Sequence, residues 1–247
     1  MRRCLGLTCL LLLAATAGAR VDDDFETDRP DLAEGPGPVS AGHLQVEAGW
    51  TRAAFTRHSR QDVVGEVLVR IGIAPHLELR GVLPSWNRLA LEQPAPTREM
   101  KGFDAAGMGL KVGVPLASQR FALGVLSHVI FPGGSGTFRS DRTNFDVLVA
   151  GAYALARSSL SANAGVQRSD GAWGEFAVVS LSADIGARMG GYVESAVEQV
   201  DGESQWTWDT GVTWRPVQWT QLDARVGAVS GFGETWAMFG AGISQRW

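Results

Sequence analysis

The sequence has little cysteine, little lysine and no long apolar run, and each shortage excludes a class of protein. Its two cysteines, Cys4 and Cys9, lie inside an N-terminal segment that we expect to be removed, which excludes disulfides, thiol catalysis and cysteine metal sites from the mature chain. Two lysines, Lys101 and Lys111, are too few for the basic stripe that binds nucleic acid. Beyond the N-terminal segment no apolar run approaches the roughly 18 residues that a membrane-spanning helix needs.

Recognisable catalytic and metal-binding patterns are also missing. The four histidines, His43, His58, His76 and His128, are dispersed without a His-x-x-x-His pair or a cysteine partner, so we expect no metal site. No Gly-x-Ser-x-Gly elbow occurs. A hydrolase would need a Ser–His pair formed between strands, such as Ser161 with His128. We therefore predict no catalytic residue and no cofactor.

The N-terminus has the pattern of a secretory signal peptide. Arg2 and Arg3 precede a leucine-rich apolar run, which ends in the small residues Ala17-Gly18-Ala19. This predicts a signal peptide over residues 1–19, cleaved after Ala19. The alternative, a membrane anchor, is disfavoured because the run is too short to span a bilayer and is followed at once by Asp22-Asp23-Asp24. The mature chain then has 20 basic and 26 acidic residues.

The rest of the chain alternates apolar and polar residues with a period of two, which is typical of β-strands. Leu44, Val46, Ala48 and Trp50, for example, share one face of a segment whose other face carries polar residues. Residues 120–130 differ, because both of their faces are apolar. We predict about 12 strands, near residues 43–54, 63–73, 77–85, 103–114, 120–130, 144–154, 159–167, 175–185, 192–200, 205–214, 220–229 and 236–247.

An even number of strands of this length predicts an all-β antiparallel transmembrane β-barrel of the outer-membrane type, over residues 43–247. Tight links alternate with longer ones, such as 85–101 and 131–143, as periplasmic turns and outer loops do. If the first strand runs outward, tryptophans fall at two rims. The periplasmic rim would hold Trp214, Trp219 and Trp247, and the outer rim Trp50, Trp86, Trp206 and Trp236. A soluble β-sandwich is the alternative, disfavoured by the steady strand length.

A short motif precedes the first predicted strand. Thr27-Asp28-Arg29-Pro30 is followed by Val39, Gly42, Gln45, Glu47 and Gly49 in the spacing Val-x-x-Gly-x-x-Gln-x-Glu-x-Gly. The motif resembles the opening of an outer-membrane family named for phenol meta-pathway degradation, whose members are often described as transporters. The final residues Phe239, Ile243 and Trp247 resemble the assembly signal of such barrels, and this implies the barrel-assembly machinery and outer-membrane lipids as partners.

The segment before the first strand, residues 20–42, is predicted to be an acidic periplasmic leader. Pro30 lacks a backbone donor and its charged neighbours would face lipid, so the segment Thr27, Asp28, Arg29, Pro30 and Asp31 cannot easily belong to the wall. Two interpretations remain open. Arg29 could pair with an inward acid such as Glu47 and plug or gate the pore, or the segment could be a structural clasp.

The polar faces of the strands predict the lumen lining. An excess of acids there suggests a weak preference for cations. The predicted lining residues are Glu47, Glu66, Arg70, Glu78, Arg80, Lys111, Asp146, Asp184, Glu194, Glu198, Asp209, Asp223, Arg225 and Arg246.

Three functions fit these features. The first is passage of a small, apolar or aromatic solute across the outer membrane, favoured by the resemblance and by an apolar inner face near Leu126 and Ile130. The second is a barrel that transports nothing and meets a partner through its loops at 85–101 and 131–143. The third, an outer-membrane hydrolase, is the least favoured because no elbow or ligand set supports it.

Overall fold

The computed structural model describes residues 25–247, except for residues 31, 57–58, 92–97, 119 and 232. The predicted signal peptide, Asp31 and His58 lie outside the described residues. In the described part, strands dominate and a single turn of 3-10 helix, η1 (Gly136–Phe138), is present. No helix in this part is long and apolar enough to cross a membrane.

The strands follow one another along the chain with short links. They are β1 (Leu44–Thr56), β2 (Ser59–Ala74), β3 (Leu77–Val82), β4 (Trp86–Leu91), β5 (Arg98–Phe103), β6 (Gly107–Val114), β7 (Phe121–Ile130), β8 (Asn144–Ala154), β9 (Ser158–Ser169), β10 (Ala172–Asp184), β11 (Met189–Val200), β12 (Glu203–Val217), β13 (Thr220–Gly231) and β14 (Glu234–Arg246).

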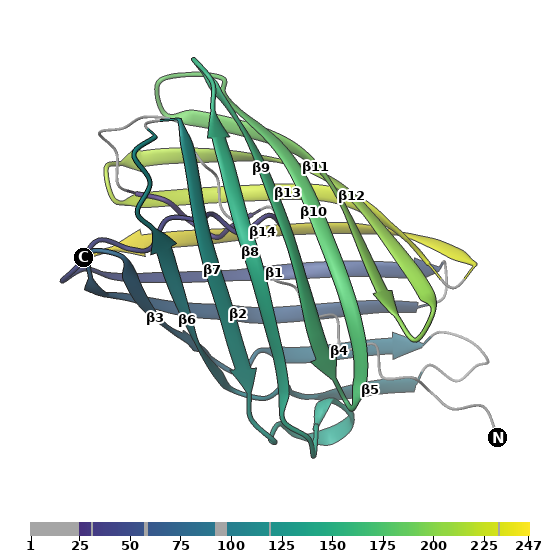
Figure 1. The fold of residues 1–247 in the computed structure, drawn as a ribbon. Coiled ribbons are helices and arrows are strands. Elements are labelled where there is room, and N and C mark those ends of the chain that lie inside the picture. Colours follow the sequence, from purple (N-terminus) through teal and green to yellow (C-terminus); the bar gives the residue numbers. More distant parts are fainter. Residues whose placement is uncertain (1–24, 31, 57–58, 92–97, 119, 232) are drawn as a thin grey trace.

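These strands form one closed antiparallel barrel of twelve wall strands (Figure 1). Closure comes from β1, which pairs with both β14 and β2. Two of the wall strands are broken in the middle. β2 pairs with β3 along one half and with β4 along the other, so β3 and β4 together make one wall strand, and β5 and β6 make the next. The predicted fold class and strand number are therefore confirmed.

One predicted outer loop is wrong. Residues 85–101 were expected to be a loop, but Trp86–Leu91 and Arg98–Phe103 are wall strands that pair with each other. Gly65, with a φ of 109°, and Glu66, with a φ of 42°, form a bulge in β2 just where β2 changes partner from β3 to β4. A bulge bends a strand and ends regular pairing, so β2 lies beside different partners on its two sides, which the alternation of side chains does not predict.

The edge of β5 that faces away from β4 is covered by a loop. In the described residues β7 pairs with β6 but not with β5. The loop 131–143 lies there instead: the Ser135 backbone N–H donates to the Phe103 carbonyl at 2.8 Å, and the Phe103 N–H donates to Ser135 Oγ at 2.9 Å. The loop therefore completes the wall beside the broken strand.

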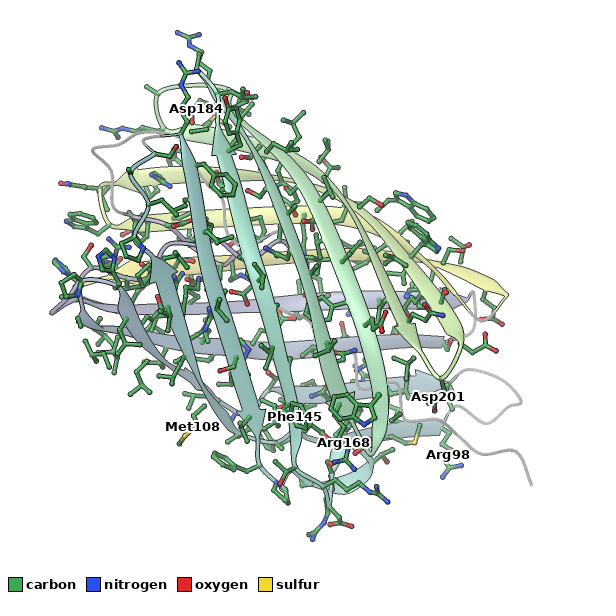
Figure 2. The ribbon with its side chains drawn as sticks, viewed as in Figure 1. Arg98, Met108, Phe145, Arg168, Asp184 and Asp201 are labelled. Atoms are coloured by element: carbon green, nitrogen blue, oxygen red, sulfur yellow. The ribbon has the colours of Figure 1, made fainter. Side chains whose placement is uncertain are left out.

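The outer surface is apolar, as the alternation predicts for a lipid-facing wall. Figure 2 shows side chains projecting from it, among them Met108, which is 52% exposed. Trp206, Trp214 and Trp247 are exposed on this surface. Trp236 is not: it is 5% exposed and has the parity of the buried Met238, so its predicted place in the outer aromatic rim is wrong. The side chain of this third residue of β14 faces inward.

Candidate functional site

Residues 25–40, called the leader from here on, cross the interior of the barrel (Figure 1, dark purple). The leader starts beside the link between β12 and β13. There the buried ring of Phe25 packs edge-on against Trp219, with ring centroids 6.1 Å apart, and lies under the guanidinium groups of Arg215 and Arg246. Arg215 also donates a hydrogen bond to the Phe25 carbonyl at 2.9 Å. The leader is thus fixed at its first described residue.

Asp28 is the anionic centre of the leader. Its buried carboxylate lies 2.7 Å from Arg80, 2.9 Å from Lys111 and 3.2 Å from Arg70, which come from three different wall strands. Burial by itself raises the pKa of this carboxyl, but the three cations together hold it well below its usual value. A charge-assisted network of this kind holds the leader to β2, β3 and β6.

Arg29 binds the neighbouring part of the wall, where the barrel closes between β2 and β13. Its guanidinium contacts Glu66 of β2 at 3.0 Å and Asp223 of β13 at 3.3 Å, and it donates to the carbonyl of Ala241 at 3.2 Å. These partners are two of the inward acids predicted from the sequence, but Glu47, the example given there, is not one of them. Glu47 accepts instead from the Asp28 backbone N–H at 3.0 and 3.1 Å and lies 3.0 Å from Arg70. The side chains of residues 28 and 29 therefore bind neighbouring parts of the wall, and both reach β2.

Two wall glycines make room for Arg29. A Cβ on Gly49 or Gly242 would lie 2.2 Å from the guanidinium or its Nε. Both glycines belong to strands that pair at this level, β1 and β14. Any other residue at either position would therefore push the guanidinium away from its acids.

The leader then crosses to the far wall. The Pro30 carbonyl accepts from Arg225 at 3.0 Å. The N–H groups of Leu32 and Ala33 donate to the Glu194 carboxylate at 2.5 and 3.1 Å. Beyond them, the Glu34 N–H donates to Asn163 Oδ1 at 2.5 Å, and Asn163 Nδ2 donates to the Glu34 carbonyl at 2.9 Å. These bonds replace the ladder partners that a strand would have.

The side chain of Glu34 reaches back to the cations of β3 and β6 that also bind Asp28. Its carboxylate lies 2.9 Å from Arg80 and 3.7 Å from Lys111. Burial raises the pKa of Glu34 to about 8, although Arg80 opposes this rise. Burial is the main cause of the high pKa, and the carboxylate of Asp28, which shares Arg80 and Lys111 with Glu34, raises it further.

The opening motif has a structural role at each of its spaced positions. The Val39 N–H donates to Glu78 at 2.7 Å, and Gly42, with a φ of 86°, donates to the Gly72 carbonyl at 2.8 Å. Gln45 donates to the Glu26 carbonyl at 2.8 Å. Glu47 receives the Asp28 N–H, and Gly49 leaves space for Arg29. The motif therefore encodes contacts between the leader and the first strand.

Most residues predicted to line the lumen are buried inside the barrel. Two differ. Asp184 is exposed at the end of β10, where Figure 2 labels it, and Glu198 is half-buried and accepts from Gln167. The buried ones are Glu47, Glu66, Arg70, Glu78, Arg80, Lys111, Asp146, Glu194, Asp209, Asp223, Arg225 and Arg246.

The wall formed by β7–β10 differs from the charged wall. Leu126, Leu148, Ala150 and Phe176 form a buried apolar cluster on its inner face. The leader reaches this wall through Asn163 and at Gly124, where an added Cβ would lie 2.4 Å from the Pro36 carbonyl oxygen. The sequence signal for this wall is the doubly apolar stretch 120–130, although the contribution of Phe176 is not visible in it.

The serine–histidine pair considered from the sequence is not assembled. His128 lies opposite Asp146, and its Nδ1 is 3.0 Å from Asp146 Oδ1. Asp146 in turn lies opposite Gln167, whereas Ser161 lies six residues further along β9, a separation of about 20 Å. Within the described ranges, no three His, Cys, Asp or Glu side chains are placed so that they could hold a metal ion.

Comparisons with known proteins agree with this architecture. The model of a family described as "Putative MetA-pathway of phenol degradation" matches residues 27–247. The match begins at Thr27, the first residue of the opening motif, and runs to the last residue. No curated protein matches the chain.

Among solved structures, an outer-membrane channel from Pseudomonas putida is similar, with a TM-score of 0.68 and 10% identity over 85% of this chain and 97% of the other. The KdgM porin gives 0.57 and 9% identity over 81% and 98%. The translocator domain of the autotransporter NalP from Neisseria meningitidis gives 0.53 and 11% identity over 84% and 90%. At such identities, these likenesses establish a shared outer-membrane barrel fold.

Proposed function

Because this chain belongs to the family described as "Putative MetA-pathway of phenol degradation", we propose that it is an outer-membrane channel for small apolar or aromatic molecules. The fold is the outer-membrane barrel fold of its structural neighbours, among them a channel and a porin. Two finer parts of the proposal are the solute class and the role of the leader. Both are argued from the side chains that line the lumen.

The observation that carries the proposal is the division of the lumen into two unlike walls. Strands β1, β2, β3, β6 and β13 carry the acids and bases that bind Asp28 and Arg29. The inner face of strands β7–β10 presents Leu126, Leu148 and Phe176, with the paired His128 and Asp146 beside them. An apolar solute avoids the cost of passing buried charges if it follows the apolar wall. We therefore place the solute path along β7–β10.

The leader acts as a plug in this proposal. It is bound to the charged wall by several ion pairs, whereas it meets β7–β10 mainly through Asn163 and the glycine of β7. A plug attached more strongly on one side can open along the other side while it stays attached. Passage then requires a local shift of residues 32–36 and not release of the whole leader.

Single-channel recording in planar bilayers tests the proposal. The reconstituted protein is compared with a variant that lacks residues 25–40, and phenol is added to the bath. We expect brief openings for the intact chain, a larger and more persistent conductance for the deletion variant, and a partial block of its current by phenol. An absence of openings in both proteins would contradict the channel function. Openings that phenol leaves unchanged would contradict the solute class.

Enzyme activity has no support in the described site, so we propose that the protein is not an enzyme. His128 has a carboxylate partner but lies far from Ser161. A lipase or esterase assay on detergent-solubilised protein should therefore give the same rate as empty micelles.

A further inference from the structure

We propose that His128, Asp146 and the adjacent apolar cluster form a binding site for a small aromatic molecule that carries a hydroxyl group. The inference rests on the proposed channel function. The site would be the place on the solute path where the channel distinguishes one solute from another. Three features of the β7–β10 wall carry it: an oriented imidazole, an apolar surface next to it, and polar atoms left over for a ligand.

The imidazole is oriented by its partner. His128 Nδ1 lies 3.0 Å from Asp146 Oδ1, and the two residues face each other on β7 and β8. The imidazole ring lies over Gly109 of β6. A Cβ at this glycine would be 2.4 Å from the Cδ2 atom of His128, so the ring can lie against the wall because Gly109 has no side chain. A carboxylate that accepts from Nδ1–H leaves Nε2 of a neutral histidine as a hydrogen-bond acceptor.

Polar atoms of this pair lack protein partners. His128 is 5% exposed and Asp146 is 1% exposed. Among the described residues, His128 Nε2 and Asp146 Oδ2 are buried without a hydrogen-bond partner. Buried polar atoms are rarely left in this state without a reason, because each such atom costs free energy. A ligand hydroxyl that donates to Nε2 would remove that cost at His128.

The apolar surface begins at the next inward-facing residue after His128 on β7 and after Asp146 on β8. Leu126 and Leu148 face each other at the next level of the wall, and Leu148 lies opposite Gly165. The ring of Phe176 covers that glycine, where an added Cβ would be 2.7 Å from the ring. A leucine pair beside an aromatic ring packs well against another aromatic ring. Leu126 and Leu148 are 0% and 1% exposed, so a ligand ring reaches them only with the local shift of residues 32–36 that the channel proposal requires.

The geometry selects an aromatic ring with one hydroxyl over a purely apolar molecule. The spacing of two residues along a strand, about 7 Å, matches a ligand whose ring lies on Leu126 and Phe176 while its hydroxyl reaches His128. A phenolic hydroxyl donates more strongly than an aliphatic one, so the Nε2 acceptor favours phenol over a simple alcohol. The leader contacts the wall at Gly124 and Asn163, which lie two residues along their strands beyond the level of Leu126 and Leu148 as counted from His128.

Binding by equilibrium dialysis tests this site directly. Phenol and toluene are compared because they differ by a hydroxyl in place of a methyl group, and micelles without protein provide the background. We expect the wild-type protein to prefer phenol. His128→Leu should weaken phenol binding by about tenfold, the value of one hydrogen bond, and leave toluene binding unchanged. Phe176→Ala should weaken both ligands together.

The control is His76→Leu, at an exposed position in the link between β2 and β3, which should alter neither ligand. Heat-modifiable migration in detergent gels verifies that each variant is a folded barrel. If His128→Leu does not fold, Asp146→Asn serves instead and should reduce the preference for phenol. Equal binding of both ligands to the wild type, or a preference that survives loss of His128, overturns the site.

The outcomes separate the site from the channel function. Openings in bilayers together with phenol binding that does not depend on His128 would contradict the site and leave the channel in place. Phenol binding that depends on His128 in a protein without openings would support the site and contradict the channel.

Discussion

Arg29 and Asp223 lie 194 positions apart in the sequence, and their side chains are joined across the lumen at 3.3 Å. Arg29 also contacts Glu66 of β2 and the Ala241 carbonyl of β14. These partners stand on both sides of the junction between β1 and β14, where the barrel closes. A single leader residue therefore bonds to the first and the last parts of the wall.

Reversing this charge should open the channel. Arg29→Glu places a carboxylate between Glu66 and Asp223, and like charges at such distances repel strongly when buried. We expect longer openings and higher conductance in single-channel recordings. Arg168→Glu is the matched control, since Arg168 is exposed on the outside of β9 beside Trp173. Unchanged openings in Arg29→Glu would exclude a gating role and favour a structural clasp.

Removing the anion of Asp28 should destabilise the barrel. Asp28→Ala leaves Arg70, Arg80 and Lys111 with less compensation in a buried place, and breaking a buried ion pair in this way costs about 3–5 kcal/mol. Urea unfolding followed by tryptophan fluorescence measures the loss. Asp184→Ala, at an exposed position, should change the free energy of unfolding little. A loss of similar size in both variants would disprove the central role of Asp28.

The leader should loosen as the pH rises. Burial raises the pKa of Glu34 to about 8, so the bound leader retains a proton that a free leader would lose near the ordinary value of 4.5. The corresponding stabilisation is complete below pH 4.5 and declines as the pH rises towards 8. Hydrogen exchange of residues 32–40 should therefore become faster, after correction for intrinsic rates, between about pH 4.5 and pH 8. Glu34→Gln should remove most of this change, and a steep change that persists would refute the explanation.

A methyl group at Gly49 should displace the leader. Its Cβ would lie 2.2 Å from the Arg29 guanidinium, whereas a Cβ on Gly81 would meet only Val69, at 3.8 Å. Overpacking of this kind costs about 1–3 kcal/mol. Gly49→Ala should thus increase hydrogen exchange in the leader, and Gly81→Ala should not. Equal exchange in the two variants would show that the guanidinium can move aside freely.

The wall could be predicted from the sequence because its period is a local property. Strand boundaries near β8 and β13 follow directly from alternation, and the inward acids and bases follow from its parity. The alternation fails at Gly65–Glu66, where a bulge intervenes, and the prediction of a loop over residues 85–101 is separately wrong, because these residues contain the hairpin of β4 and β5. A bulge depends on the backbone, which the period of side chains does not record.

The leader was harder to predict. Its motif indicated that residues 27–30 do not belong to the wall, but the partners of Arg29 depend on the path of a segment without regular structure. Glu47 was a reasonable partner by proximity in sequence, and it does bind the leader, through the backbone of Asp28. The pair formed by His128 and Asp146 was missed because it joins two strands whose register had not been assigned.

The loop over β5 has a consequence for contacts between molecules. A strand edge with free backbone groups is a template on which a neighbouring chain can add a strand of its own. At Phe103 both backbone groups of this edge are already bonded to Ser135, the carbonyl to its backbone N–H and the N–H to its side-chain oxygen. The break in the wall is therefore sealed from within the same chain, and two barrels meeting at this edge would have no hydrogen-bonding groups of Phe103 to share.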